Sequence, residues 1–266
     1  MPGTPERLLT GALLLAGLGY LLFGLWLYLN QSRMIYFPDF ASPRDDIGTE
    51  LFSIDGEAIR VHVMNPGRRK AVLYFGGNAE AVGYSAERLA QALPGKTLYL
   101  VNYRGYGGST GKPEERALYG DALQIFDAIR PRHESIAVIG RSLGSGVATW
   151  LAVERRIDRL VLVTPFDSLA GIAGAAFPLY PAGLLLRERY ASAERAPRID
   201  TETLILAAGD DSIVPEDSTR KLAGAFAQGN ARLVTIPGAG HNSLSEKREY
   251  YRQLTDFLIR DQSKNR

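Results

Sequence analysis

The sequence predicts an α/β protein built on a mostly parallel, mixed β-sheet of about eight strands, with helices on both faces. Two observations predict this fold. Short apolar runs rich in β-branched residues alternate with helical patterns from residue 71 onward, which is typical of parallel βαβ units with right-handed crossovers. Before them, residues 51–54 and 59–63 form two expected strands around Asp55-Gly56, a hairpin turn signal that adds antiparallel strands.

Composition narrows the classes of protein that fit. The 266 residues suffice for one large domain plus an appended segment. Lys and Arg (31) nearly balance Asp and Glu (29), and the largest basic cluster, residues 68–70, is expected to be a solvated turn, so we expect no nucleic-acid partner. The chain has no cysteine, which excludes disulfides, thiolate metal sites and a cysteine nucleophile but does not fix the compartment.

The N-terminal segment predicts a membrane anchor. Residues 8–29 are uncharged and apolar, and as a helix they would span about 30 Å, the thickness of a bilayer core. Trp26 and Tyr28 lie near one end, where interfacial aromatic residues belong. A cleavable signal peptide has a shorter core and a small-residue cleavage site, which residues 30–36 lack. We therefore expect a retained single-pass anchor at residues 1–33, on a membrane side that the flanking charges do not determine.

The domain is expected to occupy residues 34–266. Its first residues, 34–38, are apolar, and two placements stay open for them: the membrane interface or the surface of the domain. The further expected strands are residues 71–75, 97–101, 136–140, 159–164, 204–208 and 231–236. The expected helices end at about residue 93, span 113–129, end at about 155, and span 216–227 and 244–259.

Residues 165–198 interrupt this alternation. The segment contains four prolines and an apolar stretch of small residues from 170 to 186. It predicts a small helical insertion over the sheet edge, which is a candidate lid; a long crossover connection is the alternative.

Residues 136–146 combine a strand, a sharp turn and a helix. The apolar strand ends in Gly140-Arg141-Ser142-Leu143-Gly144, and small residues at helical spacing follow. This Gly-x-Ser-x-Gly pattern is typical of a nucleophile elbow, in which a serine with strained backbone angles exposes its hydroxyl at the turn. Ser142 is therefore the candidate nucleophile.

A serine hydroxyl needs a base within hydrogen-bonding distance and an acid that orients the base. Of the three histidines, only His241 follows a late strand, in a glycine-rich loop that can bend toward the elbow. His62 lies in the early hairpin, and His133 lies in a charged loop where we expect it to be solvated. His241 is the candidate base.

Two adjacent aspartates are candidates for the orienting acid. Asp210 and Asp211 both follow a strand that lies between Ser142 and His241 in the sequence. The chain order is then Ser, Asp, His, as expected for a catalytic triad built on a nucleophile elbow. We prefer Asp211, because the residues that follow it, Ser-Ile-Val-Pro, commonly follow the acid in this fold. Asp167 is a further candidate whose alternative role is to cap the helix after it.

A tetrahedral intermediate also needs hydrogen-bond donors for its oxyanion. The backbone N–H of Leu143, directly after the nucleophile, is one expected donor. The second should come from the loop after the strand 71–75, where the N–H of Asn78 is preferred and that of Ala79 is the alternative.

Two similar motifs fit other roles better. Ser109 also lies in a Gly-x-Ser-x-Gly sequence, but several loop residues separate it from its strand, so we expect a turn. Gly111-Lys112 resembles part of a phosphate-binding loop, but the required glycine is replaced by Tyr106 and the required Ser or Thr by Pro113.

Together the motifs resemble the membrane-tethered ABHD-type group of α/β-hydrolase fold serine hydrolases. The resemblance runs from the anchor to the last helix, with two departures: Gly76 stands where the group usually has His, and Asn102 where it often has Asp. The matching segments are Tyr36-Phe37-Pro38, Phe75-Gly76-Gly77-Asn78-Ala79, Asn102-Tyr103-Arg104-Gly105-Tyr106-Gly107-Gly108-Ser109, Gly140-Arg141-Ser142-Leu143-Gly144, Asp211-Ser212-Ile213-Val214-Pro215 and Gly240-His241.

The resemblance implies hydrolysis of carboxylic esters or thioesters through an acyl-enzyme, with no metal or organic cofactor. The anchor and the apolar insertion favour a small-molecule or lipid-like acyl ester as substrate. An amidase or peptidase with the same triad, and a non-catalytic binding protein on a hydrolase fold, are the alternatives.

Overall fold

A computed structural model describes residues 5–259, whose central feature is one eight-stranded sheet. The strand order is β1-β2-β4-β3-β5-β6-β7-β8. The pairs β1–β2 and β2–β4 are antiparallel and the other five are parallel, which confirms the predicted mixed sheet. The strands are β1 (Thr49–Ile54), β2 (Glu57–Met64), β3 (Lys70–Phe75), β4 (Lys96–Val101), β5 (Ser135–Arg141), β6 (Leu160–Val163), β7 (Thr203–Ala208) and β8 (Ala231–Ile236).

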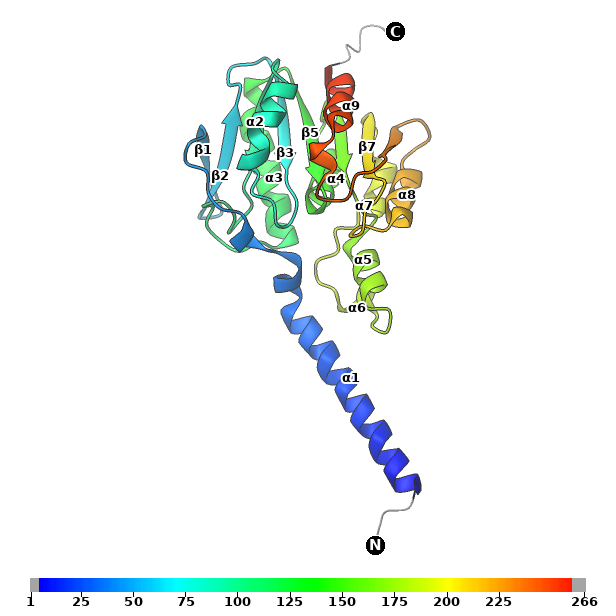
Figure 1. The fold of residues 1–266 in the computed structure, drawn as a ribbon. Helices are drawn as coiled ribbons and strands as arrows, with labels where there is room; N and C mark the ends of the chain where they lie inside the picture. Colours follow the sequence, from blue (N-terminus) through cyan, green and yellow to red (C-terminus); the bar gives the residue numbers. More distant parts are fainter. Residues whose placement is uncertain (1–4, 260–266) are drawn as a thin grey trace.

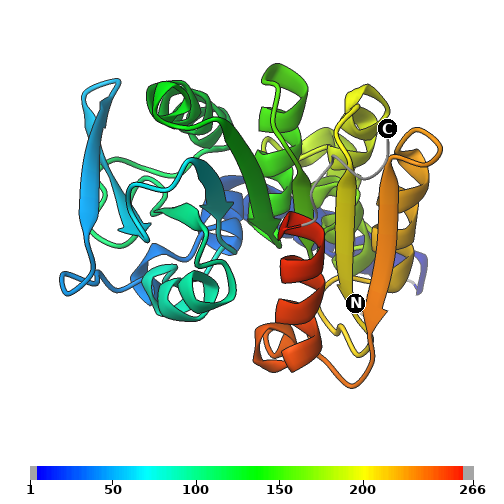
Figure 2. The same cartoon turned by 90° about the horizontal axis from the view of Figure 1, so that it is seen from above.

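Helices cover both faces of the sheet, also as predicted (Figure 2). One face carries α2 (Gly83–Ala92) and α9 (Arg248–Ile259), which pack against each other. The opposite face carries α3 (Glu115–Ile129), α4 (Leu143–Glu154) and α8 (Glu216–Ala225). Each face has its own apolar core, so the central parallel strands are buried on both sides and consist almost entirely of apolar residues.

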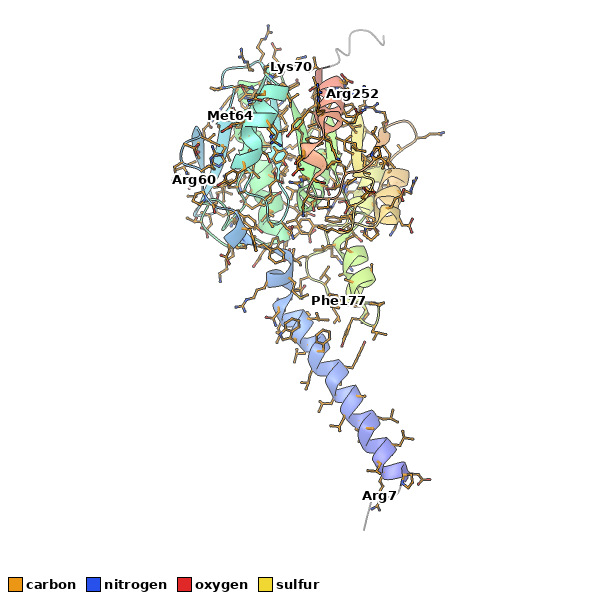
Figure 3. All side chains as sticks on the ribbon, in the orientation of Figure 1. Arg7, Arg60, Met64, Lys70, Phe177 and Arg252 are labelled. Atoms are coloured by element: carbon orange, nitrogen blue, oxygen red, sulfur yellow. The ribbon has the colours of Figure 1, made fainter. Side chains whose placement is uncertain are left out.

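The first helix, α1 (Pro5–Ile35), extends away from the domain (Figure 1). Among residues 5–259, it is the one helix that is long enough and apolar enough to cross a membrane, judged by length and composition alone. Its most apolar stretch has a mean hydropathy of 2.1, and only 6% of that stretch is buried. Figure 3 shows side chains projecting from α1 on all sides, with Arg7 near the far end. The helix therefore leaves an apolar surface uncovered.

The residues after α1 pack on the domain, which settles the placement that the sequence left open. Tyr36 is only 4% exposed, and Ile35 is also buried. The backbone N–H of Phe37 donates to the carbonyl of Asn78 (3.1 Å). The end of α1 thus reaches the loop that follows β3.

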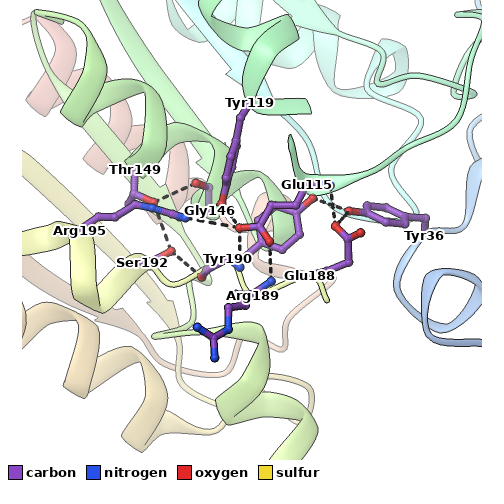
Figure 4. A network of polar contacts seen from close by, with 10 residues as sticks. All are labelled: Tyr36, Glu115, Tyr119, Gly146, Thr149, Glu188, Arg189, Tyr190, Ser192 and Arg195. Atoms are coloured by element: carbon purple, nitrogen blue, oxygen red, sulfur yellow. Dashed lines mark hydrogen bonds and ion pairs between the residues drawn. The ribbon is translucent and has the colours of Figure 1, made fainter. Parts of the chain in front are cut away.

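Buried polar groups hold this end of α1 in place (Figure 4). The Tyr36 hydroxyl donates to the Glu188 carboxylate (2.7 Å) and lies 2.7 Å from the Tyr190 hydroxyl. Glu188 also accepts the backbone N–H of Glu115, the first residue of α3. The Glu115 carboxylate in turn accepts the N–H groups of Arg189 and Tyr190. We call these four side chains, Tyr36, Glu115, Glu188 and Tyr190, the clasp; they join α1, α3 and the insertion.

The insertion, residues 165–198, contains three short α-helices and a 3₁₀ turn at Ala196–Arg198. α5 (Leu169–Ala176) and α6 (Ala182–Leu185) extend on the same side of the domain as α1, whereas α7 (Ser192–Arg195) contacts α4 (Figure 1). The α5 helix is capped by Ser168, whose hydroxyl accepts the N–H of Gly171 (3.0 Å), and not by the side chain of Asp167.

Some local predictions were wrong. His133 is buried rather than solvated, because its ring lies 2.9 Å from the Tyr99 hydroxyl on β4 and 2.9 Å from the Arg68 carbonyl. The last helix begins at Arg248 rather than at residue 244, since a separate 3₁₀ turn occupies Leu244–Glu246. Local sequence did not show either long-range contact or this break.

Candidate active site

Ser142 lies between the end of β5 and the start of α4. Its φ of 50° and ψ of −116° are strained for a residue with a side chain, as a nucleophile elbow requires. The glycines on either side permit this turn. A Cβ at Gly144 would collide with the Phe75 carbonyl, and one at Gly140 would collide with the Gly144 carbonyl. The small residues of the motif therefore let β3, β5 and α4 meet beneath the serine.

Ser142, His241 and Asp211 form one hydrogen-bonded chain. His241 Nε2 lies 3.0 Å from Ser142 Oγ, and His241 Nδ1 lies 2.9 Å and 3.1 Å from the two carboxylate oxygens of Asp211. The three residues come from the ends of β5, β7 and β8, which meet at the carboxyl edge of the parallel sheet. This edge is where open α/β sheets bind their ligands.

The environment of Asp211 favours its ionised form. Burial acts to raise the pKa of this carboxyl, but hydrogen bonds from His241, Val214 and Ile213 outweigh burial and hold the pKa below its usual value. The two backbone N–H groups donate to Oδ1 at 2.8 Å and 2.9 Å. Asp211 is thus a fixed carboxylate, able to orient the ring of His241.

The other two acid candidates lie elsewhere. Asp210 is exposed, and its backbone N–H donates to the Ala239 carbonyl. Asp167 accepts the Ser218 hydroxyl (2.7 Å) and pairs with Lys221 (2.6 Å). Among the three aspartates, Asp211 is the one that contacts His241.

The remaining histidines and the second serine motif have structural partners. His62 is buried in β2, with its ring 3.0 Å from the Thr49 hydroxyl. The Ser109 hydroxyl accepts the N–H of Arg60 (2.9 Å) and donates to the Asn102 carbonyl (2.9 Å), so it braces a loop.

The loop after β3 lies against the serine. A Cβ built on Gly77 would be 3.6 Å from that of Ser142. The Asn78 carbonyl accepts the Tyr106 hydroxyl (2.8 Å), and the Asn78 side-chain amide donates to the Ile35 carbonyl (2.9 Å). Across the described range 5–259, the N–H groups of Asn78 and Ala79 have no acceptor within the chain. Both remain candidate donors to an oxyanion.

Leu143 is the first residue of α4. Its N–H is one of the unpaired groups at a helix N-terminus, where the helix dipole also favours negative charge. We expect this N–H to donate to the oxyanion together with an N–H from the loop after β3.

Glu80 is a site residue that the sequence reasoning missed. Its carboxylate accepts the N–H of Gly77 (2.9 Å) and the hydroxyls of Tyr74 and Ser85 (2.8 Å each). It also pairs with the largely buried Arg141, the variable residue before Ser142 (3.1 Å). Glu80 therefore joins the loop after β3 to the turn at Ser142; a carboxylate two residues after Asn78 was the only signal in the sequence.

We expect Glu80→Gln to lower kcat for an acyl ester by up to about a hundredfold, because the loop donors would lose their fixed position. The free energy of unfolding should fall by about 3 kcal/mol, since Arg141 would lose its buried partner. Ester turnover and urea unfolding measure these effects.

Glu87→Gln is the matched control. Glu87 is an exposed carboxylate on α2 that pairs with Arg44 at 3.2 Å, so its loss should change stability by less than about 1 kcal/mol and leave kcat unchanged. A folded Glu80→Gln protein with wild-type kcat would contradict the positioning role.

A cavity of about 680 Å³ opens at Ser142; we call it the serine cavity. Its floor is the Ser142–His241 pair and the loop after β3. Its walls are mainly apolar and come from the end of α1 and the residues just after it, from α5 and the loop before it, and from the loop after β7: Met34, Ile35, Phe37, Phe166, Leu169, Ile172, Ile213 and Val214. Within residues 5–259, His, Asp and Glu side chains form no group of three suited to a metal ion.

Comparison with known proteins identifies the family. The sequence matches the family described as alpha/beta hydrolase fold over residues 70–189 and 179–248, more than half of the chain. The chain belongs to the alpha/beta hydrolase fold family. Among solved structures, this α/β hydrolase resembles Est1E from Butyrivibrio proteoclasticus with a TM-score of 0.68 at 16% identity, over 80% of this chain and 98% of that one. This likeness shows the fold.

Curated relatives of this α/β hydrolase include membrane and lipase proteins. It is 36% identical over 235 residues to Rv2307c of Mycobacterium tuberculosis, covering 82% of this chain and 83% of that protein. It is 28% identical over 258 residues to the membrane protein YNL320W of Saccharomyces cerevisiae (88% and 90% covered). It is 30% identical over 224 residues to the lysophosphatidylserine lipase ABHD12 of Danio rerio (70% and 57% covered). The ABHD-type resemblance is confirmed, and hydrolase activity and membrane association are supported.

Proposed function

We propose that this protein is a membrane-anchored serine hydrolase that cleaves carboxylic ester or thioester bonds of acyl-chain substrates. The hydrogen-bonded chain Ser142–His241–Asp211 carries the proposal. A serine hydroxyl 3.0 Å from an imidazole nitrogen, with the other nitrogen 2.9 Å from a buried carboxylate, is the geometry that nucleophilic acyl transfer needs.

In the first half-reaction, His241 Nε2 removes the hydroxyl proton as Ser142 Oγ attacks the acyl carbonyl. Asp211 holds the ring with Nδ1 protonated and stabilises the imidazolium that forms. The carbonyl π electrons move onto oxygen, where the N–H groups of Leu143 and of Asn78 would stabilise the oxyanion, with Ala79 as the alternative donor. Collapse breaks the ester C–O or thioester C–S bond, and His241 returns its proton to the leaving group.

In the second half-reaction, His241 deprotonates a water molecule that attacks the acyl-enzyme. The same donors hold the second oxyanion, and the proton returns to Ser142 Oγ as the acid is released. No step in this sequence requires a metal or an organic cofactor.

The apolar walls of the serine cavity favour an acyl-chain substrate. Its polar groups cluster at Ser142, as expected of a site that acts on one carbonyl of an otherwise apolar molecule. The relative named lysophosphatidylserine lipase ABHD12 supports a lipid ester as the substrate class.

We also propose that α1 is a retained single-pass anchor. Its 31 residues exceed the 20 or so that cross a bilayer core, and the clasp ties its last turn to the domain. The domain at residues 34–266 would then act at the membrane surface.

Labelling with a fluorophosphonate probe tests the proposal in the full-length protein. We expect covalent modification of Ser142 and faster turnover of p-nitrophenyl acyl esters than of matched acyl amides. Dominant amide turnover would indicate an amidase or peptidase instead. Absence of labelling in folded protein would indicate a binding protein on a hydrolase fold.

A further inference from the structure

An apolar groove of about 200 Å³ lies between α1 and the insertion; we call it the corridor. Leu27, Tyr28, Gln31, Met34 and Ile35 of α1 form one wall. The opposite wall consists of α5, α6 and the turn between them: Leu169, Ile172, Ala173, Ala176, Phe177, Tyr180, Ala182, Leu185 and Leu186. Figure 3 shows Phe177 on the part of the insertion that extends beside α1.

The corridor lies directly beside the serine cavity. Four residues line both of them: Met34 and Ile35 on α1, and Leu169 and Ile172 on α5. From Ile35 the α1 wall extends to Leu27, eight residues or about 12 Å of helix. An acyl group on Ser142 therefore has an apolar path that leads toward the exposed part of α1.

The Gln31 side chain, a polar group on the α1 wall of the corridor, is already paired. The Gln31 amide donates to the carbonyls of Tyr28 (2.7 Å) and Leu185 (3.4 Å), and its oxygen accepts the N–H of Arg187 (2.7 Å). These bonds also connect α1 to the insertion. A ligand in the corridor would thus meet hydrocarbon surface and few polar groups left to satisfy.

Aromatic contacts hold the far end of the corridor in shape. Tyr180 stacks on Tyr20 with ring centroids 4.5 Å apart, and its hydroxyl donates to the Tyr20 carbonyl (2.9 Å). Its ring sits against Gly24, where a Cβ would be only 2.8 Å away. A side chain at this position would push the insertion away from α1.

We propose that the corridor binds the aliphatic chain of the acyl ester, with α1 acting as one wall of the substrate site as well as the anchor. The inference rests on the proposed function and names its substrate: an ester of an unbranched aliphatic acid long enough to extend from Ser142 past Ile35. The four apolar residues that line both cavities support this occupant, because the chain must leave the carbonyl along an apolar surface.

The insertion carries exposed apolar residues beside the corridor. Leu179 is 78% exposed and Leu184 is 86% exposed, and both lie on the part of the insertion that extends on the same side as α1 (Figure 1). Because the insertion contacts Tyr20 and Gly24 within the apolar stretch of α1, these side chains would contact lipid when α1 spans a bilayer. The acyl chain then reaches the corridor sideways from the membrane, without crossing water.

A chain-length series tests the corridor in full-length protein in nanodiscs. With p-nitrophenyl acetate, butyrate, hexanoate and octanoate, kcat/KM should rise by up to about fourfold per methylene, the gain for moving one CH₂ from water to an apolar site. Ala173→Trp fills the corridor and should lower kcat/KM for octanoate at least tenfold, while that for acetate changes less than twofold.

Ala175→Trp is the matched control. It adds the same side chain to the same helix at an exposed position that does not line the corridor, so it should keep the wild-type chain-length profile. Because both variants see the same lipid, partitioning of the esters into the nanodisc affects them equally. If kcat/KM rose with chain length as steeply in Ala173→Trp as in Ala175→Trp, the proposal would be overturned.

A binding measurement separates the corridor from the proposed function. A long-chain fatty acid carrying a diazirine should crosslink to α1 or α5 in wild type and less in Ala173→Trp. If the wild type hydrolysed no ester yet gave these crosslinks, the proposed function would fail and the corridor would stand. If the wild type hydrolysed esters with kcat/KM independent of chain length and gave no such crosslinks, the corridor would not bind the acyl chain, and the proposed function would stand.

Discussion

Ser142→Ala is expected to lower kcat for acyl esters by roughly 10⁵-fold to 10⁶-fold and to abolish fluorophosphonate labelling. The hydroxyl is the nucleophile of the proposed mechanism, and the methyl of alanine cannot replace it. The fold should persist, because the lost hydroxyl hydrogen bond is to His241 and removes no apolar contact. Turnover and labelling of purified full-length protein measure the effect, with circular dichroism to report folding.

Ser109→Ala is the matched control, because the chain contains a second Gly-x-Ser-x-Gly serine. Its hydroxyl holds the Arg60 N–H and the Asn102 carbonyl, so its loss should lower the free energy of unfolding by about 1–3 kcal/mol. Labelling and kcat should stay at wild-type values. Labelling that survives in Ser142→Ala but disappears in Ser109→Ala would refute the proposed nucleophile.

The sheet and the elbow could be predicted from sequence because their signals are local. Each buried strand is a short apolar run, and the residues on both sides of Ser142 contain the strand, the turn and the helix. These features need no knowledge of distant contacts. The strand order, in which β4 lies between β2 and β3, was not predicted, because the right-handed crossover rule limits the possible topologies without selecting one.

Other features depend on contacts between distant segments. Glu80 matters because Arg141 pairs with it from 61 residues away, and nothing near Glu80 in sequence shows this. His133 lies in a loop and is buried against Tyr99 of β4, so the charged residues around it in the sequence did not predict its burial. The corridor requires α1 and α5 to lie side by side, and the two are separated by about half of the chain.

Asp210 and Asp211 show most directly what the sequence alone does not determine. Both follow β7, and a one-residue shift decides which carboxylate faces His241. The hydrogen bonds from Ile213 and Val214 to Asp211 determine the direction of that side chain, and they form only once the loop has folded. Sequence could favour Asp211 through the residues after it, but the geometry depends on the loop.

Asp211→Asn is expected to lower kcat by about 10⁴-fold, because an amide can hold the His241 ring with the wrong nitrogen protonated and cannot stabilise the imidazolium. Asp210→Asn changes the adjacent, exposed carboxylate and should leave kcat unchanged. The two variants, assayed on one ester, separate the candidates. Equal losses would indicate a general effect of the loop.

The depressed pKa of Asp211 adds a second, independent signature. A carboxyl whose pKa is lower in the folded state stabilises the protein above its unfolded pKa, and that contribution is lost as pH falls through the folded value. The wild type should therefore lose stability relative to Asp211→Asn below about pH 4. Asp210→Asn should unfold in parallel with wild type over the same range. A stability difference between wild type and Asp211→Asn that does not change with pH would show that the hydrogen bonds to Asp211 do not favour its charge, which would remove the electrostatic basis for its role beside His241.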